Sequence, residues 1–267
     1  MMKTLHSLIA AACVIAASVV CANAADHSYT AVPQNVPAKD TTSVLWLGNS
    51  FTFYFDCYNM LVEIAQSQGH RIKMKKSCVG GYTYDCHLSE PASLKAMDAW
   101  GNPYDYVILQ NQSQMNAAYA REPKRYKLAM SDAKEIVARV RAGSPDAKIL
   151  MEATWAYPGY SFGGFGSMEQ FDAYMWKGTC AMAKATKCTV SPVGKAFAIF
   201  RAERPDIDLL GPDAKHQSKY GSYLKTFVDY LMIFGDDFDN RVSDCGIDAV
   251  TAACLRAAAL KAYQSVK

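Results

Sequence analysis

The sequence lacks the patterns of three large classes of protein. It has no C-x-x-C pair and no paired histidines, so a zinc site is not expected. It has no basic block and no alternation of basic and aromatic residues, so nucleic acid is not an expected partner. Beyond residue 24 no apolar run is long enough to span a bilayer, so stable membrane insertion is not expected. No repeat or linker divides the 267 residues, which suffice for one domain with a sizeable core.

Residues 1–24 have the pattern of a secretory signal peptide. A short start containing Lys3 is followed by an apolar run over 8–20 and an A-x-A cleavage signal at 22–24. Loss of Lys3 lowers the formal net charge from +3 to +2. We therefore expect a mature protein that begins near Ala25 and is secreted or periplasmic.

The compartment in which the protein works also decides whether its cysteines are expected to form disulfides. Of the 9 cysteines, two lie in the signal segment, and in an oxidising compartment some of the others should form disulfides. Three couples are close in sequence, which leaves Cys57 odd: Cys78 with Cys86, Cys180 with Cys188, and Cys245 with Cys254. The sequence does not determine this connectivity.

Strand and helix patterns alternate along the chain. The expected strands are 44–47, 71–75, 104–109, 148–154 and 188–191, and the expected helices are 56–67, 90–100, 123–142, 168–186, 193–203, 219–234 and 249–265. This alternation predicts an α/β fold, a three-layer α/β/α sandwich around a five-stranded parallel sheet. We expect an N-terminal arm over 25–42 and a single domain over 43–267.

The break after the first strand is where chemistry is expected. The apolar run 44–47 is typical of a strand buried on both faces, and Gly48-Asn49-Ser50 ends it before an amphipathic run. In open α/β sheets, ligands bind at the carboxyl ends of the strands, so Ser50 stands where a nucleophile would be useful. The alternative is that Ser50 only caps the next helix.

A base for such a nucleophile is present near the C-terminus. Asp213 and His216 are three residues apart, so both side chains can face one direction. In a serine hydrolase the histidine takes the proton of the nucleophile, and the aspartate orients the imidazole. The alternative is a surface turn with an incidental histidine.

A developing oxyanion also needs hydrogen-bond donors. The candidates are the backbone N–H groups of Ser50 and Gly81 and a side-chain amide after the third strand, from Gln110, Asn111 or Gln112. Each of these can also be read as an ordinary turn or a polar strand end.

In this order, these residues resemble the SGNH (GDSL-type) hydrolase superfamily. Gly48-Asn49-Ser50 matches the family's Gly-Asp-Ser block, and Gly81 matches its oxyanion glycine. Asp213 and His216 match its final Asp-x-x-His block. The resemblance covers about residues 44–230 and implies the flavodoxin-like SGNH hydrolase fold and a Ser50–His216–Asp213 triad.

This sequence departs from the family in two blocks. Asn49 replaces the usual aspartate and is expected to line the substrate site. The third block, Gly-x-Asn-Asp, is replaced by 110–113, so the third donor is expected from Gln110 or Gln112, with Gln110 slightly favoured and Asn111 lining the site. Because some carbohydrate-ester members have a glutamine in this block, the resemblance favours sugar acyl esters.

A competing nucleophile is Ser161, in a literal G-x-S-x-G with Asp213 and His216 downstream. Pro158 and the surrounding glycines do not suit the tight strand-to-helix elbow that this motif needs. Residues 157–166 form a loop rich in aromatic residues and glycines, which we call the aromatic loop. We expect this loop to line the substrate cleft instead, through Tyr157, Tyr160 and Phe162.

The expected function is that of an extracytoplasmic serine esterase that hydrolyses carboxylic esters through an acyl-enzyme. The expected substrate is a small-molecule or glycan ester, with an O-acetyl carbohydrate ester favoured, and no metal or organic cofactor is expected. The alternatives are a lipid or lysophospholipid esterase and a carbohydrate-binding protein of the same fold with little turnover. The oligomeric state does not follow from the sequence.

Overall fold

The protein is described by a computed structural model that covers residues 29–30, 41–159 and 164–267. Six strands form one sheet in the order β1-β3-β2-β4-β5-β6. Their bounds are β1 Tyr29–Thr30, β2 Thr41–Gly48, β3 Arg71–Cys78, β4 Tyr106–Leu109, β5 Lys148–Glu152 and β6 Thr189–Ser191. All neighbours from β3 to β6 are parallel, which confirms the predicted five-stranded parallel sheet. The short β1, which was not predicted, pairs antiparallel with the outer edge of β3.

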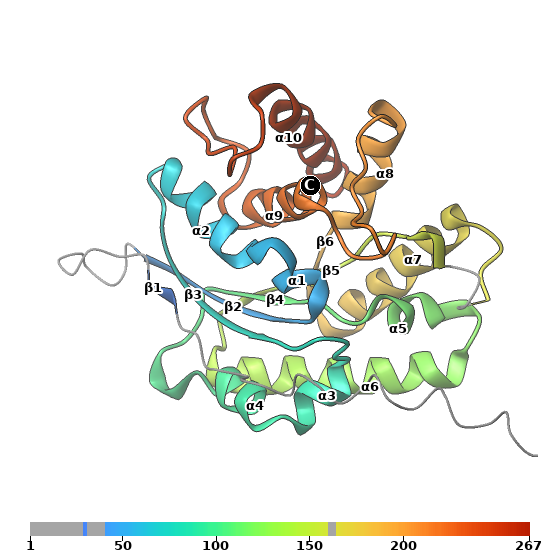
Figure 1. The fold of residues 1–267 in the computed structure, drawn as a ribbon. Helices are drawn as coiled ribbons and strands as arrows, with labels where there is room; N and C mark the ends of the chain where they lie inside the picture. The colour runs from blue at the N-terminus through green and yellow to red at the C-terminus, as the bar shows by residue number, and fades with distance from the viewer. Residues whose placement is uncertain (1–28, 31–40, 160–163) are drawn as a thin grey trace, which may run out of the picture.

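Ten α-helices and three short 3-10 turns are described around this sheet. The α-helices are α1 Ser50–Phe53, α2 Cys57–Ser67, α3 Tyr84–Ser89, α4 Pro91–Met97, α5 Ser113–Ala117, α6 Pro123–Gly143, α7 Met168–Thr186, α8 Val193–Glu203, α9 Lys219–Phe234 and α10 Ala249–Gln264. The 3-10 turns are η2 Tyr54–Asp56, η3 Ala99–Gly101 and η4 Ala118–Ala120. Helices α2, α8, α9 and α10 cover one face of the sheet, and α3, α4 and α6 cover the other (Figure 1). In the described part of the chain, no helix is both long and apolar enough to cross a membrane.

The core is divided by the sheet because side chains alternate along each strand. In β2, Val44 and Trp46 pack on the α9 side, whereas Leu45 and Leu47 pack on the α6 side. All four side chains are fully buried. A continuous apolar run is what a central parallel strand needs, and it carries the chain directly to Ser50 at the carboxyl edge.

A buried ionic cluster lies under the same strand. Lys225 of α9 contacts Glu152 at the end of β5, and its Nζ is 3.5 Å from Asp229 Oδ2; all three side chains are fully buried. The Lys225 ammonium also lies 4.6 Å from the centre of the Trp46 ring. Burial raises the pKa of the Glu152 carboxyl to about 8, because Lys225 only partly offsets the lost hydration. The i, i+4 spacing of Lys225 and Asp229 is also typical of exposed helix pairs, so the sequence did not indicate this cluster.

Replacing Lys225 by Met should lower the free energy of unfolding by about 3–5 kcal/mol, because two buried carboxyls then lose their cation. Loss of Lys225 raises the pKa of both carboxyls further, so the folded variant holds more protons at pH 8 than the folded wild type does, and the deficit should be larger at pH 8 than at pH 5. Denaturant unfolding at both pH values measures this. Lys261→Met is the matched control, because Lys261 pairs with Glu203 at the surface, where 54% and 45% of the side chains are exposed; its effect should stay below about 1 kcal/mol. An equal deficit at both pH values would contradict the prediction.

Candidate active site

Ser50 begins α1 directly beyond the end of β2. At Gly48 the chain has no room for a side chain, because a Cβ would lie 2.5 Å from Thr52 Oγ1. Asn49 caps α1 by accepting a hydrogen bond from Phe51 N at 3.1 Å, and its Nδ2 donates to Tyr82 O at 2.9 Å. Asn49 therefore joins the Ser50 turn to the loop that carries Gly81.

The structure brings Ser50, His216 and Asp213 into one hydrogen-bonded row. His216 Nε2 is 2.8 Å from Ser50 Oγ, and His216 Nδ1 is 2.5 Å from Asp213 Oδ2. The other carboxylate oxygen accepts the backbone N–H groups of Lys215 at 3.1 Å and of His216 at 3.0 Å. The three residues predicted from the sequence thus lie together, although 166 positions separate Ser50 from His216.

The Asp213 carboxylate determines which nitrogen of the His216 imidazole carries the proton. Partial burial would raise the pKa of Asp213, but the hydrogen bonds from the His216 ring and from two backbone N–H groups outweigh it, and the pKa is lowered. An ionised carboxylate only accepts hydrogen bonds, so Nδ1 of His216 carries the proton. Nε2 is then left to accept the Ser50 hydroxyl proton, as a general base must.

The turn that carries Asp213 and His216 is anchored to the rest of the site. Trp155 Nε1 donates to Lys215 O at 3.1 Å, and the Trp155 ring stacks on Phe51 with ring centres 4.3 Å apart. Gln217, which the sequence analysis missed, donates from Nε2 to Phe51 O at 3.0 Å. The turn that carries Ser50 and the turn that carries His216 are therefore held together by these contacts.

Ser50 opens onto a small polar pocket of about 100 Å³. Its lining consists of Asn49, Ser50, Phe51, Gly81, Gln112, Ser113 and Lys215. Gly81 has φ of +75°, a conformation that favours glycine, and no atom lies within 4 Å of the place where its Cβ would be. Ser113 and Lys215 were not predicted, although Lys215 lies inside the D-x-x-H motif itself.

Gln112 is the amide that faces this pocket. Its Oε1 accepts a hydrogen bond from Gln114 N at 2.9 Å and so caps α5. With the oxygen used in this way, the amide Nε2 is the part of Gln112 that remains to donate. Gln112, Gly81 and Ser50 thus bring three candidate oxyanion donors to one pocket.

Gln110 lies elsewhere, which differs from the expectation that slightly favoured it. Its side chain is fully buried; Oε1 accepts from Asn49 N at 2.9 Å and Thr52 Oγ1 at 3.2 Å, and Nε2 donates to Asn111 O at 2.5 Å. Through these hydrogen bonds, the Gln110 amide holds the Ser50 turn against the end of β4. Asn111 is also buried rather than lining the site, and its Oδ1 accepts from Gln112 N at 2.9 Å.

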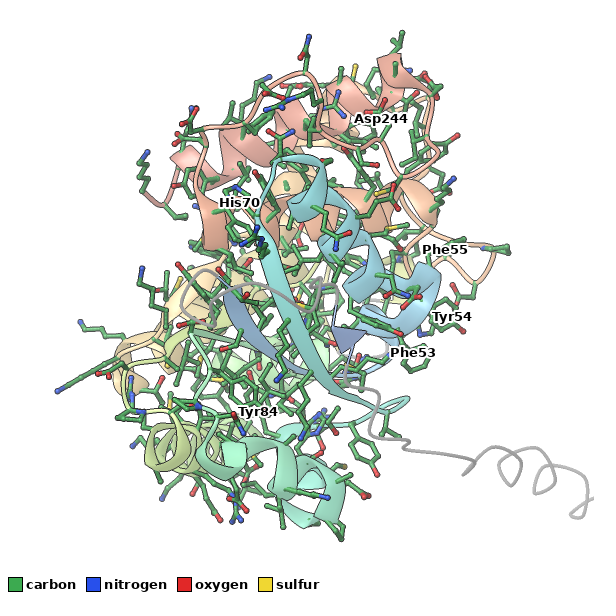
Figure 2. The ribbon with its side chains drawn as sticks, turned by 90° about the vertical axis from the view of Figure 1, so that its left-hand side faces the viewer. Phe53, Tyr54, Phe55, His70, Tyr84 and Asp244 are labelled. Carbon is green, nitrogen blue, oxygen red and sulfur yellow. The ribbon has the colours of Figure 1, made fainter. Side chains whose placement is uncertain are left out.

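The aromatic loop also differs from expectation where it is described. Tyr157 is 2% exposed and lies behind Ser113, with the two hydroxyl oxygens 3.3 Å apart. It therefore supports the pocket without lining it. Tyr160, Ser161 and Phe162 lie outside the described residues. The exposed aromatic side chains that follow Ser50 are instead Phe53, Tyr54 and Phe55 (Figure 2), and of these Tyr54 stacks on His216 with ring centres 4.3 Å apart.

A second histidine was not predicted to matter but supports β2. His87 is fully buried, with Nε2 3.1 Å from Gly48 O and Nδ1 2.8 Å from Ser93 Oγ. Burial lowers the pKa of His87 to about 4, against the opposing effect of the Gly48 carbonyl. Its imidazole is therefore neutral at neutral pH and holds the strand end in place.

The expected disulfides are not present among the described residues, where all seven cysteines are free. Each thiol of the first couple has another neighbour: Cys78 donates to Trp46 O at 3.7 Å, and Cys86 lies 3.2 Å from Thr83 Oγ1. Cys180 lies within α7, whereas Cys188 follows the end of that helix and donates to Thr186 O. Cysteines that are close in sequence therefore do not form disulfides among the described residues.

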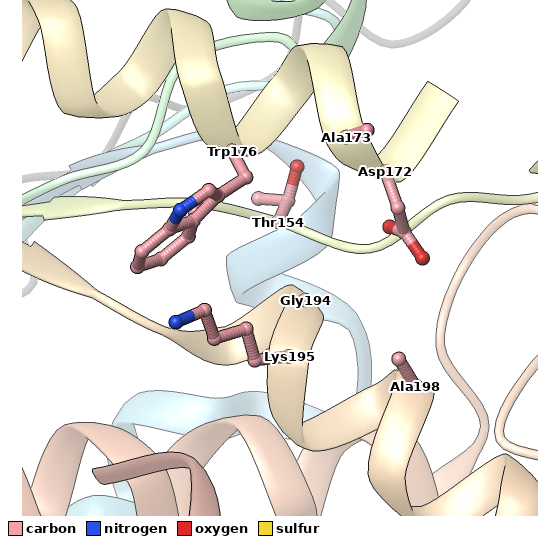
Figure 3. A pocket seen from close by; sticks show the side chains of 8 residues that line it. Thr154, Asp172, Ala173, Trp176, Gly194, Lys195 and Ala198 are labelled. Atoms are coloured by element: carbon pink, nitrogen blue, oxygen red, sulfur yellow. The ribbon is translucent and has the colours of Figure 1, made fainter. Parts of the chain in front are cut away.

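A larger pocket, of about 210 Å³, lies between α7 and α8 (Figure 3). Its walls are mostly apolar, and Lys195 Nζ lies 3.9 Å from the centre of the Trp176 ring. The carboxyl group in this pocket is that of Asp172, which accepts a hydrogen bond from Ala156 N at 2.9 Å. Burial raises the pKa of Asp172 to about 6. The residues lining it include no pair of nucleophile and histidine base, so the chemistry points to the smaller pocket.

Neither a family model nor a curated protein matches the sequence. Solved structures do match: a DUF4886 family protein from Bacteroides uniformis has a TM-score of 0.67 at 19% identity, over 85% of this chain and 95% of that one. A candidate SGNH hydrolase from Slackia heliotrinireducens has a TM-score of 0.58 at 22% identity, over 72% and 99%. A variant of Axe2, an acetyl-xylooligosaccharide esterase from Geobacillus, has a TM-score of 0.55 at 12% identity, over 74% and 97%. The structural neighbours thus include SGNH hydrolases and esterases beside the DUF4886 protein, and this chain has the SGNH hydrolase fold.

Proposed function

We propose that the protein is a serine esterase that hydrolyses small acyl esters, with O-acetyl carbohydrate esters as its substrates. The observation that carries this is the row Ser50–His216–Asp213, which opens onto the polar pocket. The fold shared with SGNH esterases supports an ester hydrolase, and the name of Axe2 supports an acetylated saccharide. The pattern of residues 1–24 supports a secreted or periplasmic location.

The geometry supports a two-step reaction. Ser50 Oγ attacks the ester carbonyl while His216 Nε2 takes its proton, and the oxyanion is stabilised by the N–H groups of Ser50 and Gly81 and by the Gln112 amide. The tetrahedral intermediate collapses as His216 returns the proton to the leaving alcohol. Water then attacks the acyl-enzyme in the same way, with His216 as base, and releases the acid and free Ser50.

The pocket favours a small acyl group over a lipid chain. A volume of about 100 Å³, with polar and apolar walls in nearly equal parts, suits an acetyl group, whereas a long acyl chain needs an extended apolar site. A binding protein without turnover, the other alternative, would not need an imidazole held 2.8 Å from a serine hydroxyl.

The direct test is labelling with a fluorophosphonate, which reacts with activated serines. One adduct should form, peptide mapping should place it on Ser50, and turnover of p-nitrophenyl acetate should fall in step with labelling. Turnover that persists after complete labelling, or an adduct on another serine, would refute the proposal.

Changing Gln112 to Glu should lower kcat by about 10²–10³-fold, because it removes one oxyanion donor. A glutamate at this position can still accept the Gln114 N–H, so the cap of α5 and the thermal midpoint should be retained. Gln114→Glu is the control, because it adds the same charge on the same helix without lining the pocket. If both variants lose activity equally, the charge and not the lost donor is responsible.

A further inference from the structure

Three consecutive aromatic side chains lie exposed beside the active site. Phe53, Tyr54 and Phe55 follow the nucleophile by only three to five positions and are 38%, 41% and 52% exposed. Figure 2 shows them near one another on the right-hand side of the molecule, about half-way up. We call these residues the aromatic segment. Exposed apolar side chains that are contiguous, unlike scattered ones, indicate a binding surface.

The backbone of this segment is held in an unfavourable conformation. Phe55 and Asp56 have φ of 53° and 56°, in the left-handed region that side chains with a Cβ disfavour. The Tyr54 carbonyl accepts hydrogen bonds from Gln217 Nε2 and Ser222 Oγ, both at 3.4 Å. Strained backbone of this kind persists only where surrounding contacts impose it, and it tends to occur at functional sites.

The rings form a continuous row with the catalytic imidazole. Tyr54 stacks on His216 with ring centres 4.3 Å apart and planes 8° apart, and Phe53 stacks on Tyr54 at 5.5 Å and 26°. A Cβ on Gly80 would lie 3.8 Å from the Phe53 ring, so the row reaches the loop of the Gly81 donor. Phe53 and Tyr54 of the aromatic segment therefore border the site from the base to the oxyanion loop.

The reaction chemistry says which half of the ester meets this row. His216 returns the proton to the leaving oxygen, so the alcohol half of the ester must lie on the His216 side, next to Tyr54. Building on the proposed function, we propose that the aromatic segment binds the alcohol half of the ester and that this half is a pyranose ring.

A sugar ring fits this surface better than an apolar chain does. One face of a pyranose presents C–H groups that can pack on aromatic rings, while its hydroxyls stay in water at an open surface. A long apolar alcohol or acyl chain would be bound better by an enclosed slot. Polar groups also lie beside the row, since the Asp213 side chain is 48% exposed and Lys215 lines the pocket.

The test uses Phe53→Ala, because Phe53 is the exposed outer ring of the row and its backbone is right-handed, so alanine removes the ring without adding strain. Acetate release is followed from two esters, fully acetylated methyl xyloside and ethyl acetate, and octanoate release from ethyl octanoate serves as the probe for an acyl site. The loss of kcat/KM on the xyloside should exceed the loss on ethyl acetate by about tenfold, mainly through KM, because the apolar contact with the sugar ring is lost. Leu128→Ala, which removes an exposed apolar side chain on α6, is the control and should leave the ratio unchanged.

The possible outcomes separate this proposal from the proposed function. Equal losses on both esters would overturn the assignment of the aromatic segment, and so would a loss confined to ethyl octanoate, which would indicate an acyl site. If the wild-type protein hydrolyses neither ester, the proposed function fails. In that case, calorimetric titration with methyl xyloside tests the sugar surface by itself: binding about tenfold weaker in Phe53→Ala supports it, and equal or absent binding overturns it.

Discussion

Replacing Ser50 by Ala is expected to lower kcat for ester hydrolysis by roughly 10⁵–10⁶-fold, the size of effect seen when a serine hydrolase loses its nucleophile. Without Oγ no acyl-enzyme can form, and the oxyanion donors can promote only slow attack by water. The fold should be unaffected, because the cap of α1 comes from the Asn49 side chain and not from Ser50. Acetate release and the thermal midpoint are the two measurements.

Ser161→Ala is the matched control for this prediction. It removes the serine of the G-x-S-x-G pattern, whose placement lies outside the described residues, and it should retain most activity. The pair of variants therefore decides between two nucleophiles that the sequence offers with the same downstream Asp213 and His216. Substantial turnover by Ser50→Ala, with loss in Ser161→Ala, would reverse the assignment.

The long elements were predictable because a single physical rule governs each of them. Helices 168–186, 193–203 and 219–234 occur with the predicted bounds, since their apolar residues repeat at helical spacing and are ended by turn residues. The central strand 44–47 was predictable because it is apolar throughout. The short helices α1, α3 and α5 were not, because four to six residues carry too little periodicity to recognise.

The sequence could not determine which of the two glutamines, Gln110 or Gln112, faces the pocket. Gln110 and Gln112 are both amides beyond the same strand, and nothing in their types distinguishes a buried position from one that faces the pocket. The distinction comes from tertiary contacts: Gln110 meets Asn49 N, whereas Gln112 caps α5. The prediction that Tyr157 lines the cleft was wrong for a similar reason, since Tyr157 is buried by packing on Phe51, a contact distant in sequence.

Changing Asp213 to Asn is expected to lower kcat by about 10⁴-fold, the size of effect known for this change in a serine protease triad. The amide of the new side chain would donate to Nδ1 of His216, which would put the imidazole proton on Nε2. That nitrogen could then no longer accept the Ser50 proton. The turn should keep its shape, because the amide oxygen can replace the carboxylate oxygen that accepts the backbone N–H groups of Lys215 and His216.

Fluorophosphonate labelling of Ser50 should slow in parallel with kcat, since both reactions need the same base, while the thermal midpoint should change little. Asp206→Asn provides the control, because this carboxylate is 61% exposed in its side chain and pairs with Arg204 away from the row. Retention of more than about a tenth of the activity in the Asp213 variant would mean that another group orients His216. The stacked Tyr54 ring, which lies 4.3 Å from the imidazole, would then be the group to change next.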